Sequence, residues 1–284
     1  MTKGIYIEDI KELFQKRKED ANKGDFGKVG ILGGSINYSG AVKLASLSLA
    51  SLRGGCGLVK VIIPKEIVPF VAPALLEQTL FPYENVEDIK KIIIDLDAIA
   101  VGMGWGFDEK HLSILKYVLE YFTGNLIIDA DGLNTLVDHL DLFKNTKAHI
   151  VLTPHLKEFS RLTNLTIEEI NENKIEIAKS FAKENRVILL LKGSTTIVTD
   201  GTDVYLTKYG TPGMATSGSG DILSGILAGL LGYQEFNLLT VSAGAIINGL
   251  AGEIGTEKHT DISMIARDTI EGISAAIQRI RGEN

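Results

Sequence analysis

The sequence predicts an α/β fold, with a mostly parallel central sheet flanked by helices on both faces. Short apolar runs of strand length alternate with longer segments whose apolar residues recur at helical spacing. Each run also leaves into a loop of glycine or polar residues, as parallel strands do at their carboxyl ends. With 284 residues, 45% of them hydrophobic, the chain can bury one large core, and we expect a single domain over residues 1–284.

The elements follow in chain order. Residues 29–32 form a buried strand, a glycine-rich loop covers 33–40, and 41–52 have helical spacing. The next apolar runs predict strands at 58–63, 98–101, 126–128, 150–152 and 187–191. In an open parallel sheet the carboxyl ends of the strands meet at one edge, where ligands bind. We therefore expect the loops GGSINYSG, GMGWG, DADGLN, TPHLKE and LKGSTT to converge there.

The pattern changes after Lys192. Residues 195–199 and 203–207, separated by a turn at Asp200 and Gly201, predict an antiparallel hairpin. The last third is helical, with helices at 222–231 and 238–254. A final helix carries apolar residues at 270, 273, 277 and 280, and Asp268 with Glu271 predicts a capping box at its start.

Composition limits the partners. A net charge of -7 and a pI near 5.4 argue against nucleic acid or an anionic membrane surface, which leaves a small molecule. The single cysteine, Cys56, permits no intrachain disulfide and fits a reducing cytoplasm. The first residues, MTKGIYIEDIKELF, are acidic where a signal peptide needs an apolar core, and no run reaches the roughly 18 apolar residues of a membrane span. We expect a cytoplasmic protein.

The most informative motif is GTPGMATSGSGDILSG, at residues 210–225. Gly218, Ser219 and Gly220 have little or no side chain, so an anion can approach their backbone N–H groups at the start of the helix that follows. Asp221 is out of place beside a phosphate unless it takes a proton from an attacking hydroxyl. The alternative is that Asp221 only caps the helix. The P-loop, the dinucleotide fingerprint, CxxC, HExxH and GxSxG are all absent from the sequence.

A set of strings in fixed order resembles the ADP- or ATP-dependent NAD(P)H-hydrate dehydratases, a branch of the ribokinase-like superfamily. The strings are KGDFGKVGILGGS, SGAVKLASLSLASLRGGCGLV, GMGWG, DADGLN, TPHLKEFSRL, LKGSTTIV, GTPGMATSGSGD and NGLAGE, spanning about residues 23–268. The resemblance implies a ribokinase-like fold and an enzyme that repairs NADH and NADPH hydrates. A nucleotide phosphorylates the C6 hydroxyl of the S epimer, and loss of phosphate restores the dihydronicotinamide.

The resemblance also implies site residues. Asp221 matches the base, with the amides of Gly218, Ser219 and Gly220 stabilising the transferred phosphoryl group. The hydrate contacts map to Ala41, Gly104 and His155, and those of ADP or ATP map to Lys192, Gly193, Ser194, Thr195, Thr196 and Gly220. Asp129, Asp131 and Glu158 are candidates to organise Mg²⁺ through water. Without the resemblance these residues would be assigned to core packing, tight turns, solvated strand ends and helix caps.

The sequence departs from the family pattern at three positions. Ser217 replaces a glycine, Trp105 lies in a loop that usually reads GPGLG and so beside the expected nicotinamide pocket, and Asn248 replaces a histidine. Two other functions stay open: a ribokinase-like kinase for a sugar, thiazole or pyrimidine alcohol, and a non-catalytic nucleotide sensor. The resemblance further implies a homotetramer, for which the small residues of 241–252 offer a packing surface. It also implies a separate epimerase, because about 22 residues precede the match.

Overall fold

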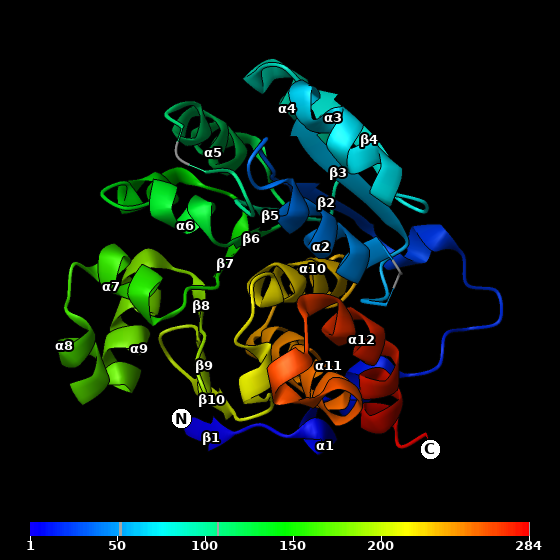
Figure 1. Cartoon of the computed structure of the whole chain (residues 1–284). Coiled ribbons are helices and arrows are strands. Elements are labelled where there is room, and N and C mark those ends of the chain that lie inside the picture. Colours follow the sequence, from blue (N-terminus) through cyan, green and yellow to red (C-terminus); the bar gives the residue numbers. More distant parts are fainter. Residues whose placement is uncertain (51–52, 107, 284) are drawn as a thin grey trace.

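A ten-stranded, mostly parallel sheet runs through the described part of the molecule (Figure 1). The structure is a computed structural model and describes residues 1–50, 53–106 and 108–283. The strand order is β1-β10-β9-β8-β7-β6-β5-β2-β3-β4, and only β9 runs antiparallel to its two neighbours. The strands are β1 (Thr2–Gly4), β2 (Lys28–Leu32), β3 (Leu58–Pro64), β4 (Thr79–Tyr83), β5 (Ala98–Val101), β6 (Asn125–Ile128), β7 (His149–Leu152), β8 (Ile188–Leu191), β9 (Thr196–Thr199) and β10 (Val204–Thr207).

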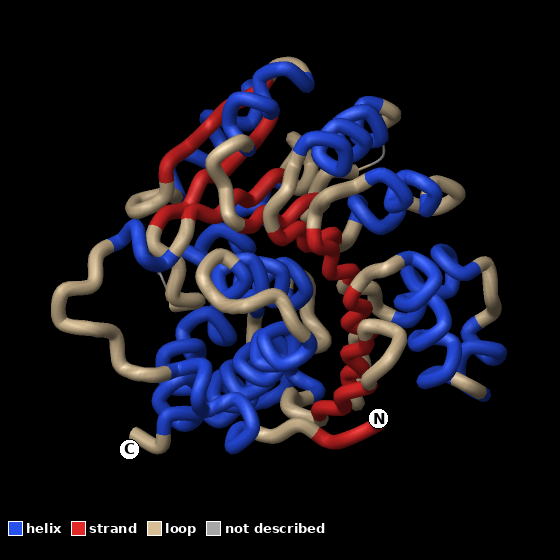
Figure 2. Tube along the Cα trace, turned by 180° about the vertical axis from the view of Figure 1, so that it is seen from behind, coloured by secondary structure: helices blue, strands red, loops and turns tan. Residues whose placement is uncertain are grey.

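Helices cover both faces of this sheet (Figure 2). The α-helices are α1 (Ile7–Ile10), α2 (Ser39–Ala50), α3 (Val68–Val71), α4 (Val86–Ile93), α5 (Lys110–Tyr121), α6 (Asp131–Thr135), α7 (Leu156–Thr163), α8 (Ile167–Glu172), α9 (Lys174–Asn185), α10 (Ser219–Leu231), α11 (Leu238–Ser263) and α12 (Ala266–Arg281). Short 3-10 turns are η1 (Lys11–Phe14), η2 (Lys23–Phe26), η3 (Lys65–Ile67), η4 (Ala72–Ala74), η5 (Leu140–Asn145) and η6 (Pro212–Met214). In Figure 1, α2 and α10 to α12 lie on one side, and α5 to α9 lie on the other.

The continuous apolar runs are explained by burial on both faces. In β5, Ile99 and Val101 belong to the core under α4 to α9, whereas Ala98 and Ala100 belong to the core under α2, α10 and α11. Successive strand residues point to opposite faces, so a strand covered on both sides needs apolar residues at every position. A third cluster joins α10, α11 and α12 to the N-terminal segment.

The predicted strands and the hairpin of β9 and β10 are confirmed. The helix predicted at 41–52 begins at Ser39, and its last two residues lie outside the described residues. The predicted capping box is wrong, because α12 begins at Ala266 and Asp268 is its third residue. The carboxylate of Asp268 accepts from the N–H of Ile265 at 2.9 Å, which satisfies a helix-start donor from inside the first turn.

Helix α11 bears on two expectations, the absence of a membrane span and the packing surface for a tetramer. By length and composition it is the one helix among the described residues that could cross a membrane, but 83% of its most apolar window is buried inside the protein, as in a core helix. Its small residues also pack within the chain. A Cβ on Gly244 would lie 2.5 Å from Leu227, and one on Gly249 would lie 2.5 Å from the backbone of Tyr209. These residues therefore offer no surface to another subunit.

Candidate active site

A cavity of about 990 Å³ opens where β6, β7 and β8 end and α10 begins. Its charged end contains Asp129, His155, Glu158, Lys192 and Asp221, each just after a strand or in the first turn of a helix. The rest of the wall is formed by Ala130, Gly193, Ser194, Thr196, Tyr209, Gly210, Thr211, Pro212, Met214, Ala215, Ser217, Gly218, Ser219, Gly220, Leu223, Ala245, Asn248 and Gly249. Three of the five loops predicted to converge at this edge, those at 129–134, 153–158 and 191–196, supply wall residues, whereas the loops at 33–40 and 102–106 supply none.

Asp221 is the third residue of α10, and the helix is preceded by Gly218 in a left-handed conformation (φ 98°). The Asp221 carboxylate accepts no hydrogen bond and forms no ion pair with any residue that the structure describes, so it does not cap the helix. Burial raises the pKa of Asp221 to about 7; the Asp129 carboxylate adds to the rise and Lys192 opposes it. A carboxylate with this proton affinity suits a general base near neutral pH.

The loop before Asp221 has the features of an anion site. The backbone N–H groups of Gly220 and Asp221 have no acceptor among the described residues, and they lie at the positive end of a thirteen-residue helix. A Cβ on Gly220 would stand only 3.4 Å from Nζ of Lys192. A phosphate above Gly220 would therefore meet both backbone donors and an ammonium group.

Buried carboxylates hold the ammonium group of Lys192 in place. Its Nζ lies 2.8 Å from Oδ1 of Asp129 and 3.9 Å from Oε2 of Glu158. Burial alone lowers the pKa of Lys192, but the carboxylates of Asp129 and Glu158 outweigh it and the net direction is upward. The buried Ser224 hydroxyl donates to Oδ2 of Asp129 at 2.7 Å. Sequence reasoning missed Ser224, although its i+3 spacing from Asp221 places both on one face of α10.

His155 is the N-cap residue of α7 and forms two hydrogen bonds with Glu158. The His155 N–H donates to Oε2 of Glu158 at 2.8 Å, and the Glu158 N–H donates to Nδ1 of His155 at 3.1 Å. Nδ1 therefore carries no proton in this arrangement, and Nε2 lies 3.4 Å from Oε1 of Glu158. Burial and Lys192 lower the pKa of His155, and burial raises that of Glu158. Both changes favour the uncharged forms.

The three carboxylates expected to organise Mg²⁺ do not gather into a direct metal site. In the described ranges no group of three His, Cys, Asp or Glu residues is placed to hold a metal ion. Asp129 is engaged by Lys192 and Ser224, and Asp131 accepts from the N–H of Gly106 at 2.7 Å. These residues therefore do not fit direct coordination.

Ala41 and Gly104, expected at the hydrate, lie beside each other but outside the wall of this cavity. Gly104 is buried with φ 68°, and a Cβ there would lie 2.9 Å from that of Ala41 and 2.5 Å from the carbonyl oxygen of Tyr38. Thr195 is also absent from the cavity wall, whereas its neighbours Ser194 and Thr196 line it.

The three positions at which the sequence departs from the family pattern lie in different surroundings. Trp105 does not border the cavity: it is 2% exposed and stacks on His111 with centroids 4.8 Å apart in the core. Ser217 is exposed and lines the cavity. Asn248 lines its apolar end, near Tyr209 and Ala245, and its buried Oδ1 has no partner in the described part of the chain.

Three comparisons with known proteins agree on the family of this chain. The family profile described as NAD(P)H-hydrate dehydratase matches residues 29–275. An ADP-dependent (S)-NAD(P)H-hydrate dehydratase of Nitrosopumilus maritimus is 32% identical over 95% of this chain and 94% of its own. The ADP/ATP-dependent NAD(P)H-hydrate dehydratase from Bacillus subtilis, co-crystallized with ATP/Mg²⁺, superposes with a TM-score of 0.86 and 26% identity over 97% of each chain.

A longer relative is similar as well. The bifunctional NAD(P)H-hydrate repair enzyme Nnr of Moorella thermoacetica is 31% identical over 94% of this chain, but only 52% of that protein is matched. The chain thus spans about half the length of the first curated relatives it matches.

Proposed function

The chain belongs to the NAD(P)H-hydrate dehydratase family, and from that membership we propose that it dehydrates the S epimers of NADH and NADPH hydrate with ADP or ATP as phosphate donor. The observation that carries the proposal is the unpaired Asp221 carboxylate, with its raised pKa, beside unpaired backbone donors and the Lys192 ammonium in one cavity. A base next to an anion site is what phosphoryl transfer to a hydroxyl requires.

The first step forms a bond between the C6 hydroxyl oxygen of the hydrate and the terminal phosphorus of the nucleotide. The bond from that phosphorus to its bridging oxygen breaks, so ADP leaves as AMP or ATP leaves as ADP. Asp221 takes the hydroxyl proton, while the N–H groups of the Gly218–Gly220 loop and Lys192 stabilise charge on the phosphoryl oxygens.

The second step breaks the bond between C6 and the phosphate oxygen. The lone pair of the ring nitrogen expels phosphate, and a proton leaves the neighbouring ring carbon. The products are the dihydronicotinamide and inorganic phosphate. We assign His155 to the hydrate because it lines the same cavity as Asp221. Ala41 and Gly104, which lie outside this wall, are proposed as hydrate contacts on the family resemblance.

The nucleotide's phosphates would then lie over Gly220, with Lys192, Gly193, Ser194 and Thr196 along one wall. Thr195, which lies off the wall, would act through the backbone of this loop. The apolar end at Tyr209, Ala245 and Asn248 suits the nucleobase, because an unpaired amide can hydrogen-bond a base edge.

For Mg²⁺ we propose entry with the nucleotide. Magnesium keeps several waters and is usually held by substrate phosphates with one or two carboxylates. Asp129, Asp131 and Glu158 would then act through water, since their oxygens are engaged within the protein. No step of the reaction is assigned to the ion.

The wider setting is also proposed. All ten strands join one sheet, which supports a single domain over residues 1–284. We further propose a cytoplasmic homotetramer that depends on a separate epimerase. Relatives matched over only half their length carry the description "bifunctional", which supports a second repair activity beside this one.

The decisive experiment follows the near-ultraviolet absorbance of the dihydronicotinamide as it recovers from purified S hydrate, with ADP, ATP or no nucleotide. We expect recovery with ADP at least as fast as with ATP, one phosphate released per molecule restored, and none without nucleotide. Accumulation of a stable phosphorylated hydrate, with no recovery, would instead identify a kinase of the same fold.

A further inference from the structure

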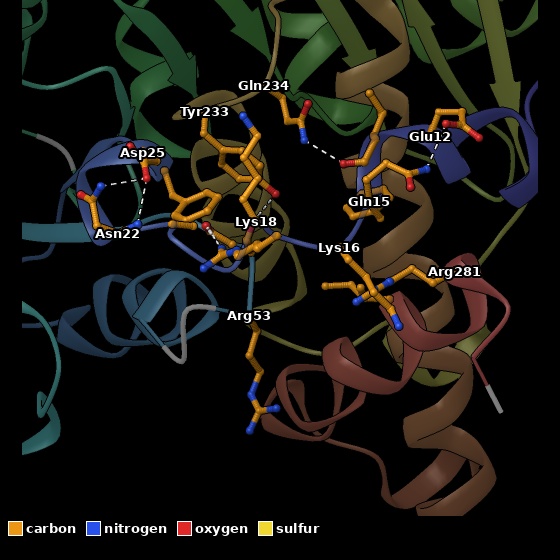
Figure 3. Close-up of a pocket in the computed structure, with 18 of the residues that line it drawn as sticks. Glu12, Gln15, Lys16, Lys18, Asn22, Asp25, Arg53, Tyr233, Gln234 and Arg281 are labelled. Atoms are coloured by element: carbon orange, nitrogen blue, oxygen red, sulfur yellow. Dashed lines mark hydrogen bonds between the residues drawn. The ribbon is translucent and has the colours of Figure 1, made fainter.

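A second cavity, of about 910 Å³, lies at the other end of α10 (Figure 3). Helix α10 begins at the candidate active site, and Tyr233 and Gln234, just beyond its last residue, line the second cavity. Gly54 and Gly55, which precede β3, belong to the same wall. The second cavity is thus at the amino ends of the strands, and the active-site cavity is at their carboxyl ends. The remaining wall comes from residues 12–18, 20–22, 25–26, 53, 277 and 281.

Among the charged side chains around this second cavity, cations outnumber anions. Lys16, Arg17, Lys18, Arg53 and Arg281 line it, against only three acidic residues, Glu12, Asp20 and Asp25. They come from the N-terminal segment, the segment after α2 and helix α12. This excess is opposite in sign to the net charge of -7 of the whole chain. Cations that converge on a concave surface focus a positive potential there.

Two of these cations are available to a ligand. Lys16 and Lys18 form no hydrogen bond or ion pair with any described residue. Two of the three acids are engaged locally: Asp25 accepts from the backbone and side-chain nitrogens of Asn22, and Glu12 accepts from Gln15 at 2.9 Å. Lys16 and Lys18 therefore have no ion-pair partner among the described residues, while Glu12, Asp20 and Asp25 keep their negative charges in the same wall.

The wall is held in place without a ligand. Gln234 donates to the carbonyl oxygen of Leu13 at 2.8 Å and so ties the N-terminal segment to the end of α10. The Arg17 guanidinium lies 3.6 Å from the centre of the Phe26 ring and donates to the carbonyl oxygen of Gly55. Phe26 in turn packs edge-to-face against Tyr233. A preformed wall spares a ligand the entropy of ordering it.

We propose that this cavity is a second, non-catalytic binding site for a small molecule carrying two or more phosphates. Its size is that of sites for nucleotide-sized ligands. The unpaired Lys16 and Lys18 suit phosphate oxygens as mobile point charges, and the aromatic edge of Tyr233 offers a surface for a ring. This proposal does not depend on the reaction assigned to the active site.

The test counts binding sites for ATP per chain by calorimetry at low ionic strength, with inorganic triphosphate and adenosine as separate probes. We expect two ATP molecules per wild-type chain. In the double variant Lys16→Glu, Lys18→Glu the second site should weaken roughly tenfold or more, because two attractions become repulsions. Triphosphate should compete for the second site and adenosine should not.

The matched control is Lys144→Glu, Lys147→Glu, which makes the same charge change at two exposed lysines away from both cavities. This control should retain both ATP sites. If the charge-reversed protein unfolds, Lys16→Gln, Lys18→Gln replaces it. One ATP per wild-type chain, or an unweakened second site in the Lys16, Lys18 variants, would overturn the proposal. Recovery of the dihydronicotinamide, followed in the same proteins, reports separately on the active site.

Discussion

Asp221 combines a chemical advantage with a structural cost. The burial that raises its pKa to about 7 makes it a better proton acceptor, and the same burial penalises its charged form in the folded protein. With no donor from the described residues to stabilise the carboxylate, the native state holds this charge at the expense of stability. Function and stability therefore oppose each other at one side chain.

We predict that Asp221→Asn lowers kcat roughly 10²- to 10⁴-fold and changes the KM for nucleotide by only a few fold, because a base acts in the transition state and not in ground-state binding. Steady-state recovery of the dihydronicotinamide measures both constants. The control is Asp200→Asn, in the exposed turn between β9 and β10, where the side-chain oxygen still accepts its two backbone bonds. Near-normal turnover in Asp221→Asn would refute its role as base.

The pKa of Asp221 also predicts two pH profiles. Since the deprotonated form is active, kcat/KM should rise with pH to a plateau above about 7. The free energy of unfolding should change in the opposite direction. Between the ordinary pKa of 3.8 and about 7, Asp221 is protonated in the folded state and deprotonated in the unfolded state. The free energy of unfolding therefore falls as the pH rises through this range. Asp221→Asn should therefore gain stability over the wild type through this range and keep the gain above it. Parallel thermal melts of the two proteins at pH 4 and pH 8 test the second profile.

At the scale of elements, the loop before α10 separates two kinds of glycine. Gly218 has φ 98°, and a Cβ there would lie 2.4 Å from Leu44. The backbone conformation and the packing of the loop therefore require glycine at this position. Gly220 has no such constraint, and a Cβ there would only narrow the space beside Lys192 and Asp129. The first glycine shapes the loop and the second leaves room for a ligand.

We therefore predict different effects for alanine substitutions at Gly218 and at Gly220. Gly218→Ala should cost about 1–3 kcal/mol of stability through strain and the contact with Leu44, and should lower Tm by several degrees. Gly220→Ala should leave Tm nearly unchanged and raise the KM for nucleotide at least tenfold. Melting curves and kinetics on both variants distinguish the effects. An equal loss of stability in the two would show that Gly220 is not a ligand contact.

The strands that were predicted from the sequence are more buried than the strands that were missed. Strands such as β5 were predictable because covering on both faces demands unbroken apolar runs. The terminal strands β1 and β4 were missed: Thr2–Gly4 contains no buried residue, and Pro82 interrupts Thr79–Tyr83. Edge strands tolerate polar residues and proline, so their local sequence carries little strand signal.

In the candidate site, too, local sequence patterns predict some features and not others. Asp221, Lys192 and His155 were predictable because a glycine loop or a strand end fixes where each side chain begins. The pairing of Lys192 with Asp129, 63 residues apart, depends on the placement of β6 and β8 on either side of β7 in the sheet, which local patterns do not encode. The stacking of Trp105 on His111 was not predictable for a related reason, since it is a tertiary contact.

For the whole molecule, the burial of α11 changes the argument about assembly. Its small residues are used within the chain, so a tetramer must form through other surfaces. We still predict, from the resemblance, a mass in light scattering near four times the 30.8 kDa of the chain. A mass of one chain at micromolar concentration would contradict it, and comparing low and high salt would show whether the contacts are mainly ionic.

The single tryptophan makes the protein its own optical reporter. Trp105 is the only indole in the chain, it is buried against His111, and it adjoins Gly104 in the loop assigned to the hydrate. Burial lowers the pKa of His111, so the imidazole is neutral at physiological pH and its protonation does not quench the emission there. Fluorescence of the unmodified protein thus follows one known loop. A bound dihydronicotinamide, which absorbs where tryptophan emits, should quench that fluorescence and so reveal product release in real time.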